Sequence, residues 1–412
     1  MLDPLLSTQL NGLSLLNLRR QRRPVVAIDA THVEIDGQRL VNFAGNNYLG
    51  LTHHPAILRA VVDATTTHGF GSGAAPLVSG YTDLHAAAET TLADWKGTED
   101  AVLFSSGFQA NLAAVGAMAA VVHSAGKAVR FLLDKWVHAS LIDAVRATGQ
   151  PYRVFPHNGI SKLRRLLQEA APEELQVVVT ESIFSMDGDA ANLSALADLK
   201  REHPFILLLD EAHAAGVYGP DGAGYAAELG LRTVVDISIV TLSKALGGIG
   251  GAICGSKHWC EAVINFGRAY LFSTSLPPAV AAAAVAAIGV LRNEPWRQAR
   301  VRALAIRVRG ELSAAGWRIP VGDSPIIPIP LGSEEAALIA SASLQKQGLL
   351  VVAIRPPTVP RGGSRLRVTL SCEHTDGEIN RLIQGLATQS RSTPECKSDP
   401  DPDEPHRDAS RS

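Results

Sequence analysis

Five short apolar runs recur along the middle of the chain, and each ends in polar or small residues. They are AVLFSS (101–106), AVRFLLD (128–134), QVVVTES (176–182), PFILLLDEAH (204–213) and DISIVTLS (236–243). Helical candidates such as FQANLAAVGAMAAVV (108–122) and ISKLRRLLQEAA (160–171) lie between them. Continuous apolar strands that alternate with helices are typical of a mostly parallel sheet covered on both faces. We therefore expect an α/β fold in which the chemistry gathers at the carboxyl ends of the strands.

The same alternation predicts one large domain over residues 46–291. From residue 292 to 389 the pattern changes to a smaller C-terminal α+β domain, with SPIIPIPLG, LLVVAIRPP and SRLRVTL as strand candidates. Residues 1–45 are expected to form an arm with leucines at helical spacing, followed by a β-hairpin around Asp36-Gly37. The polar, Pro- and Asp-rich segment 390–412 predicts a disordered tail.

Composition excludes several classes of protein. The net charge is −2 with no basic block in the body of the chain, which argues against nucleic-acid binding. The most apolar stretch, Ala279 to Leu291, is too short to span a bilayer and suits a buried helix after two prolines. The N-terminus lacks the pattern of a signal peptide, and the four cysteines form no C-x-x-C pair. We expect a cytoplasmic protein with no membrane partner and no metal site.

Lysine is rare in this chain, with nine lysines against twenty-nine arginines. One of them, Lys244, stands in TLSKALGG (241–248), between a β-branched run and a glycine cluster. A surface lysine in a loop is the ordinary interpretation, but the small, apolar flanks argue against it. A desolvated lysine at a strand end has a lowered pKa and can be a nucleophile. The best-known use is a Schiff base with the aldehyde of pyridoxal phosphate (PLP), with an aspartate opposite the pyridine nitrogen.

Asp210 can supply that aspartate, because it ends the preceding strand candidate FILLLD. His213, one helical turn later, could donate a hydrogen bond beside the cofactor ring. The D-E-A-H box also suggests a helicase-type ATPase, but that class needs G-x-x-x-x-G-K-[ST], which the sequence lacks. Asp210 alone would be interpreted as a turn cap, whereas together with Lys244 it indicates a PLP site.

A phosphate site is expected where the run AVLFSS meets the helix that follows it. Ser106, Gly107 and Phe108 stand at this junction, where free backbone N–H groups bind phosphate well and glycine allows a close approach. Thr241, three residues before Lys244, offers a hydroxyl to the same anion. Each element alone could be only a helix cap.

Two further side chains could contact the cofactor ring. His138, in DKWVHASLIDA, could stack on the ring face, although a lone histidine is more often structural. Ser185, in ESIFSMDGD, could bind the phenolic oxygen of the cofactor. A plain Asp-Gly turn explains the Ser185 segment about equally well on local sequence.

Together these segments resemble the PLP-dependent α-oxoamine synthases, a family of fold type I PLP-transferases. The matching segments are NNYLGLTHHP (46–55), LVSGYTDLHAAAE (77–89), LFSSGFQAN (103–111), DKWVHASLIDA (134–144), ESIFSMDGD (181–189), LLLDEAHAAGVYG (207–219), TLSKALGG and YLFSTSLPP (270–278). They span roughly residues 40–375. The combination is highly specific, although no single piece is.

The resemblance implies a role for each matched residue. Lys244 would carry the cofactor and move protons, Asp210 would hold the pyridinium nitrogen, and His138 would stack on the ring. His213 and Ser185 would lie near the ring oxygen, and Ser106, Gly107, Phe108 and Thr241 would hold the cofactor. Thr274 would reach the phosphate from the neighbouring subunit of a homodimer, which places the active site at the subunit interface. Asn46 and Arg367 would bind the carboxylate of the amino acid, because the arginine fork matches a carboxylate.

Members of the family join an amino acid to an acyl thioester. Residues 351–375 look most like the branch that uses alanine and a pimeloyl thioester in biotin biosynthesis; other branches use glycine with a short acyl-CoA or serine with a long acyl chain. Pro76 and Ala223 stand where the family often has arginine. A non-catalytic protein of the same fold is a different possibility, and the intact Lys244 argues against it.

Overall fold

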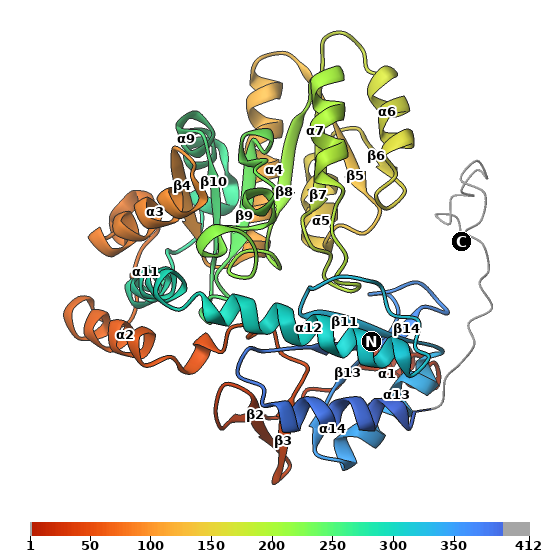
Figure 1. Ribbon diagram of the computed structural model, residues 1–412. Helices are drawn as coiled ribbons and strands as arrows, with labels where there is room; N and C mark the ends of the chain where they lie inside the picture. The colour runs from red at the N-terminus through yellow and green to blue at the C-terminus, as the bar shows by residue number, and fades with distance from the viewer. Residues whose placement is uncertain (1, 390–412) are drawn as a thin grey trace.

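The computed structural model describes residues 2–389, and its largest sheet has the strand order β4-β10-β9-β8-β7-β5-β6 (Figure 1). The expected strands are present as β4 (Asp100–Phe104), β5 (Ala128–Asp134), β7 (Glu174–Glu181), β8 (Ile206–Asp210) and β9 (Ile237–Thr241). Strands β9, β8, β7, β5 and β6 run parallel, and β10 is antiparallel to both of its neighbours. The α/β prediction with a mostly parallel sheet is confirmed.

Two strands of this sheet were not expected from the sequence, namely β6 (Tyr152–Phe155) and β10 (Gly251–Gly255). Glycine weakens a strand on its own, so GGAICG does not resemble one. The structure explains the glycine at Gly251: an added Cβ would lie 2.6 Å from the backbone nitrogen of Gly107. Close approach of two backbones therefore sets the residue type here.

Helices cover both faces of the sheet. One face packs against α4 (Gly107–Ser124), α5 (Ala139–Thr148) and α9 (Lys257–Phe266) through a core that includes Phe131 and Val177. The other face packs against α6 (Ile160–Gln168) and α7 (Leu193–Glu202) through Leu132 and Val178. Neighbouring residues of one strand thus enter different cores, as the alternation of side chains along a strand requires.

A second layer of helices lies beside the β4 edge of the sheet. It consists of α2 (Pro55–His68), α3 (Asp83–Lys96) and α11 (Pro278–Asn293), with α11 packed against the other two (Figure 1). The alanine-rich α11 begins at a proline and is largely buried, as expected. Within residues 2–389 the structure has no helix that is long and apolar enough to cross a membrane.

A smaller C-terminal unit follows α12 (Trp296–Ala314). Its three-stranded sheet has the order β11 (Ile326–Gly332), β14 (Ser364–Thr369) and β13 (Val352–Ile354), and α13 (Glu334–Lys346) and α14 (Asp376–Ala387) complete it. These elements match the expected α+β pattern. The predicted tail, 390–412, lies outside the described residues.

The N-terminal segment joins this C-terminal unit. It contains α1 (Leu2–Leu15), β1 (Val26–Ala27) and the expected hairpin of β2 (His32–Ile35) and β3 (Gln38–Asn42). Strand β12 (Leu349–Leu350) pairs in parallel with β3, which ties the hairpin to a segment about 300 residues later. Short elements complete the chain: η1 (Leu51–His53), η2 (Pro76–Gly80), η3 (Pro220–Gly222), α8 (Tyr225–Glu228), η4 (Arg232–Val234) and α10 (Arg268–Leu271).

Candidate active site

Three neighbouring parallel strands end at the same edge of the large sheet. Strand β7 ends at Glu181 and β8 at Asp210, and these two residues are paired in register. Strand β9 ends at Thr241, three residues before Lys244. The polar residues at the strand ends therefore converge, as expected for a parallel sheet.

Lys244 and His213 are in direct contact, with 2.9 Å between Lys244 Nζ and His213 Nε2. The other ring nitrogen of His213 lies 2.7 Å from the hydroxyl of Tyr48. Tyr48 is fully buried and was not among the expected site residues. Its only sequence signal was its place in NNYLGL, beside Asn46.

Burial controls the charges of this pair. Burial lowers the pKa of the Lys244 amine to about 8, although the carboxylates of Asp210 and Glu181 act in the opposite direction. Burial and the positive charges of Lys244 and Arg367 hold the pKa of His213 well below its usual value. His213 is therefore a neutral imidazole, and Lys244 has a substantial uncharged fraction near neutral pH.

Asp210 is held by two hydrogen bonds in a buried position. Asn111 Nδ2 donates to Asp210 Oδ2 at 3.0 Å, and the backbone N–H of Ala212 donates to Asp210 Oδ1 at 2.9 Å. Asn111 also donates to Ser140 Oγ at 2.9 Å, and that oxygen lies 2.7 Å from His138 Nδ1. Asn111, which sequence reasoning missed, thus links Asp210, expected at the ring nitrogen, to His138, expected to stack on the ring face.

Arg367 brings together the expected carboxylate-binding residues. From β14 it donates to Asn46 Oδ1 at 3.2 Å and to the Ser185 backbone oxygen at 2.6 Å. Its guanidinium also lies 3.5 Å from the hydroxyl of Tyr48. Arg367 is buried, and its role in binding a carboxylate stays a prediction.

The start of α4 forms the expected cradle opposite Thr241. Ser106 is the N-cap of α4, and its side chain accepts from the backbone N–H of Gln109. An added Cβ at Gly107 would point at Thr241, 3.5 Å from Oγ1, so the glycine keeps this gap open. Phe108 is 44% exposed. Free N–H groups at a helix start, a glycine and a hydroxyl fit a phosphate group.

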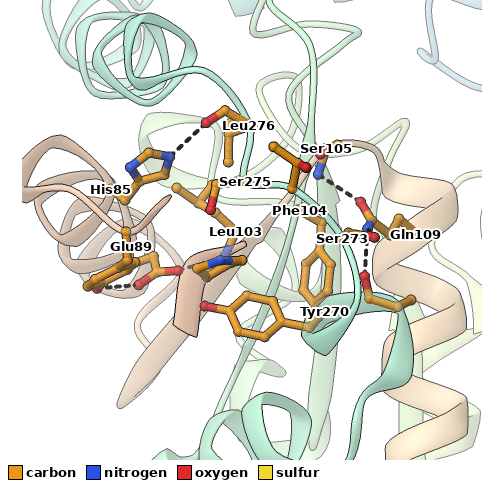
Figure 2. Close-up of a pocket in the computed structure, with 14 residues that line it drawn as sticks. His85, Glu89, Leu103, Phe104, Ser105, Gln109, Tyr270, Ser273, Ser275 and Leu276 are labelled. Carbon is orange, nitrogen blue, oxygen red and sulfur yellow. Dashed lines mark hydrogen bonds between the residues drawn. The ribbon is translucent and has the colours of Figure 1, made fainter. Parts of the chain in front are cut away.

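Thr274 belongs to a pocket whose lining does not include Lys244. It lines this pocket with Ser105 and Gln109, and Gln109 Nε2 donates to Ser273 Oγ at 2.6 Å (Figure 2). On the far side of this pocket Glu89 accepts from Tyr81 at 2.7 Å and from the backbone N–H of Leu103 at 2.8 Å. The role of Thr274 toward a neighbouring subunit stays a prediction.

Glu181 is a further site residue for which the sequence suggested no role. It is buried, and its Oε1 has no hydrogen-bond partner. Burial, and then the charge of Asp210, raise its pKa well above the ordinary value. The charge of Asp210 and the burial of Glu181 thus both disfavour the ionised form of Glu181.

Comparison with known proteins places the chain among PLP enzymes. Residues 38–386 match the family aminotransferase class I and II. The chain is 41% identical over 382 residues to 8-amino-7-oxononanoate synthase of Anaeromyxobacter dehalogenans, covering 93% of this chain and 94% of the relative. The solved structure of SPT with a PLP internal aldimine is similar, with TM-score 0.86, 30% identity and coverage of 93% and 96%. The crystal structure of 8-amino-7-oxononanoate synthase from Francisella tularensis has TM-score 0.72 and 27% identity, with coverage of 84% and 97%.

Proposed function

The chain belongs to the aminotransferase class I and II family, and we propose that it is a PLP-dependent acyltransferase that makes 8-amino-7-oxononanoate for biotin biosynthesis. The reaction is a decarboxylative condensation of L-alanine with a pimeloyl thioester, carried by CoA or by an acyl carrier protein. The observation that carries the proposal is the contact between Lys244 and His213, beside Asp210, at the carboxyl edge of the sheet.

The residues present fit PLP. Lys244 is the attachment point, Asp210 holds the pyridine nitrogen, and His138 covers one face of the ring. His213 and Ser185 face its oxygen, and Ser106, Gly107, Phe108 and Thr241 surround the phosphate. When bound, PLP supplies an electron sink for a carbanion at the α-carbon of the amino acid.

The chain's own groups then bind the amino acid and move its proton. Arg367 and Asn46 bind the carboxylate of alanine, which orients its α-carbon toward Lys244. The Lys244 amine accepts the α-proton, because its lowered pKa makes it a base near neutral pH. His138 polarises the thioester carbonyl.

The two departures from the usual family pattern are at Pro76 and Ala223. Pro76 lines the pocket of Figure 2 with Thr274. Ala223 is buried, and its carbonyl accepts from Lys96. An arginine side chain would not fit at the buried position of Ala223 without repacking of its surroundings.

The proposal includes a cytoplasmic homodimer. In such a dimer Thr274 reaches the phosphate held by the other subunit, and the pocket with Ser105 and Gln109 lies at the interface. Light scattering of the purified protein tests the dimer. A Thr274→Ala chain mixed with a Lys244→Ala chain tests the shared site, because such heterodimers have one site that combines both defects and one that has neither.

The deciding experiment is a product assay. Alanine with pimeloyl-CoA should give product, and glycine with acetyl-CoA should not. The reverse result would identify the alternative, a glycine acyltransferase. Serine with a long acyl-CoA tests the third substrate pair.

The protein should also show a visible absorption band that borohydride removes. Lys244→Ala should lack the band, and Lys127→Ala, at an exposed lysine, should keep it. A wild-type protein that ignores added PLP would rule the proposal out.

A further inference from the structure

His157 lies between two loops that carry proposed site residues. Its Nδ1 is 3.1 Å from Asp134 Oδ1, and its Nε2 is 2.6 Å from Asp189 Oδ2. Asp134 ends β5, four residues before His138, and Asp189 lies four residues after Ser185. One imidazole therefore connects the loop of the ring-stacking residue to the loop of the residue at the ring oxygen.

Two aromatic side chains also contact the ring of His157, one on its face and one at an edge-on angle. Trp136 stacks on it with ring centroids 3.9 Å apart and an interplanar angle of 15°. Phe184 meets it edge-on at 4.4 Å and 89°. Trp136 belongs to the His138 loop and Phe184 to the Ser185 loop, so the aromatic contacts join the same two segments.

The neighbouring residue, Asn158, reinforces the connection. Its backbone N–H donates to Asp134 Oδ2 at 2.9 Å, and its side chain donates to the Ala190 backbone oxygen at 3.0 Å. Asn158 has a left-handed backbone with φ of 52°, a conformation that asparagine adopts more readily than most residues. The turn at 157–158 is therefore built to face both loops.

Both ring nitrogens of His157 face carboxylates, and only an imidazolium can donate from both. Burial alone would lower the pKa of His157, but the hydrogen bonds to Asp134 and Asp189 outweigh it and raise the pKa to about 9. Asp187, which is paired with Arg365, also interacts with the charge of His157. The charged bridge is therefore present at neutral pH and is lost as the pH rises through about 9.

We propose that His157 is a positioning residue: its imidazolium bridges Asp134 and Asp189 and so fixes the separation between the His138 loop and the Ser185 loop. This proposal rests on the proposed function. His157 does not contact the reacting atoms. It acts by keeping His138, proposed to stack on the cofactor ring, and Ser185, proposed to face the ring oxygen, at a fixed separation. A displacement of about 1 Å in such a site can cost about 100-fold in rate.

The first test detects the His157 bridge by the fluorescence of Trp136 and needs no substrate. The emission of Trp136, taken as the difference between the full-length protein and Trp136→Phe, should titrate with a midpoint near pH 9. The transition should be absent in His157→Gln. A Trp136 emission that is flat between pH 7 and 10 would overturn the imidazolium bridge, whatever the protein does with PLP.

The second test measures the positioning role of His157 through kcat and the visible band of bound PLP. His157→Gln should lower kcat by about 100-fold at pH 7.5 and shift the visible band of bound PLP. Asp189→Asn, which keeps the size of the side chain, should show the same shift and covers the case in which His157→Gln does not fold. His68→Gln, at an exposed histidine paired with Asp83, is the matched control and should stay within about twofold.

These outcomes separate the two proposals. A wild-type protein that takes up no PLP contradicts the proposed function, and the Trp136 titration still decides on the bridge. A wild-type protein that takes up PLP, with His157→Gln matching His68→Gln in both kcat and the visible band, contradicts the positioning role alone.

Discussion

Lys244 Nζ lies 2.9 Å from His213 Nε2, and the directions of the neighbouring hydrogen bonds follow from that contact. The hydroxyl of Tyr48 donates to Asn46 Oδ1, so His213 Nδ1 must carry its proton and donate to Tyr48. His213 Nε2 is then the acceptor for Lys244, because a neutral imidazole has one donor and one acceptor. A single chain of hydrogen bonds connects the amine to Asn46, a residue proposed to bind the carboxylate of the substrate.

The first prediction concerns the pH dependence of PLP capture. Only the uncharged Lys244 amine attacks an aldehyde, and burial lowers its pKa to about 8. The rate of PLP capture by the cofactor-free protein should therefore rise about tenfold per pH unit below pH 8 and level off above it. Stopped-flow absorbance at the visible band measures this, and a rate that still rises at pH 10 would contradict the lowered pKa.

A second prediction concerns Arg367. Arg367→Lys should raise the KM for alanine by about 10- to 100-fold, because a lysine cannot present the planar fork to a carboxylate, and a hydrogen bond to a charged group contributes about 1.5–3 kcal/mol. The visible PLP band should change little. Steady-state kinetics with varied alanine measure the effect, and Arg318→Lys, at an exposed arginine, is the matched control. An unchanged KM would remove Arg367 from the substrate site.

Much of the site could be predicted because its signals are local. Lys244 is a rare lysine between small residues, and Asp210 directly ends a strand, so residue type and position in the strand pattern sufficed. Tyr48 and Asn111 carry no such signal. Each acts through a partner about 100 residues or more away, Tyr48 on His213 and Asn111 on Asp210. Only the folded chain brings those partners together.

The parts of the fold that could not be predicted from the sequence also depend on contacts between distant segments. The hairpin of β2 and β3 was visible in its Asp36-Gly37 turn, but its pairing with β12 was not, because periodicity identifies a strand and not its distant partner. Strand β10 was missed because its glycine at 251 is required by contact with Gly107, and local propensity therefore points away from a strand.

The third prediction concerns Glu89, in the pocket of Figure 2. Burial raises the pKa of Glu89 to about 7, although its hydrogen bonds with Tyr81 and Leu103 lower it in part. The folded protein therefore keeps a proton that the unfolded chain releases near pH 4.5, and the stability contributed by this group falls as the pH rises toward about 7.

Glu89→Gln removes this titration. Relative to wild type, its melting temperature should rise between pH 5 and pH 8, with a full effect of about 3 kcal/mol. Thermal unfolding followed by circular dichroism measures the difference. Glu335→Gln, on an exposed part of α13, should shift equally at both pH values. A constant difference for Glu89→Gln would contradict the raised pKa.

The last prediction concerns the buried ion pair of Lys96 and Glu211, next to Asp210. Lys96 Nζ donates to Glu211 and to the Ala223 backbone oxygen, and both side chains are almost fully buried. Lys96→Met leaves the Glu211 carboxylate buried without its cation and should cost roughly 3–5 kcal/mol of stability. Adding Glu211→Gln should restore part of that loss, because the charge is then removed.

The matched control for this pair is Lys200→Met. Lys200 donates to Asp236 and to the Val234 backbone oxygen, the same type of contacts, but the side chains of that pair are 22% and 33% exposed. Water can solvate Asp236 after the substitution, so the loss should stay near or below about 1 kcal/mol. Urea unfolding of the three variants measures the losses. Equal losses for Lys96→Met and Lys200→Met would show that burial does not set the strength of the Lys96 interaction.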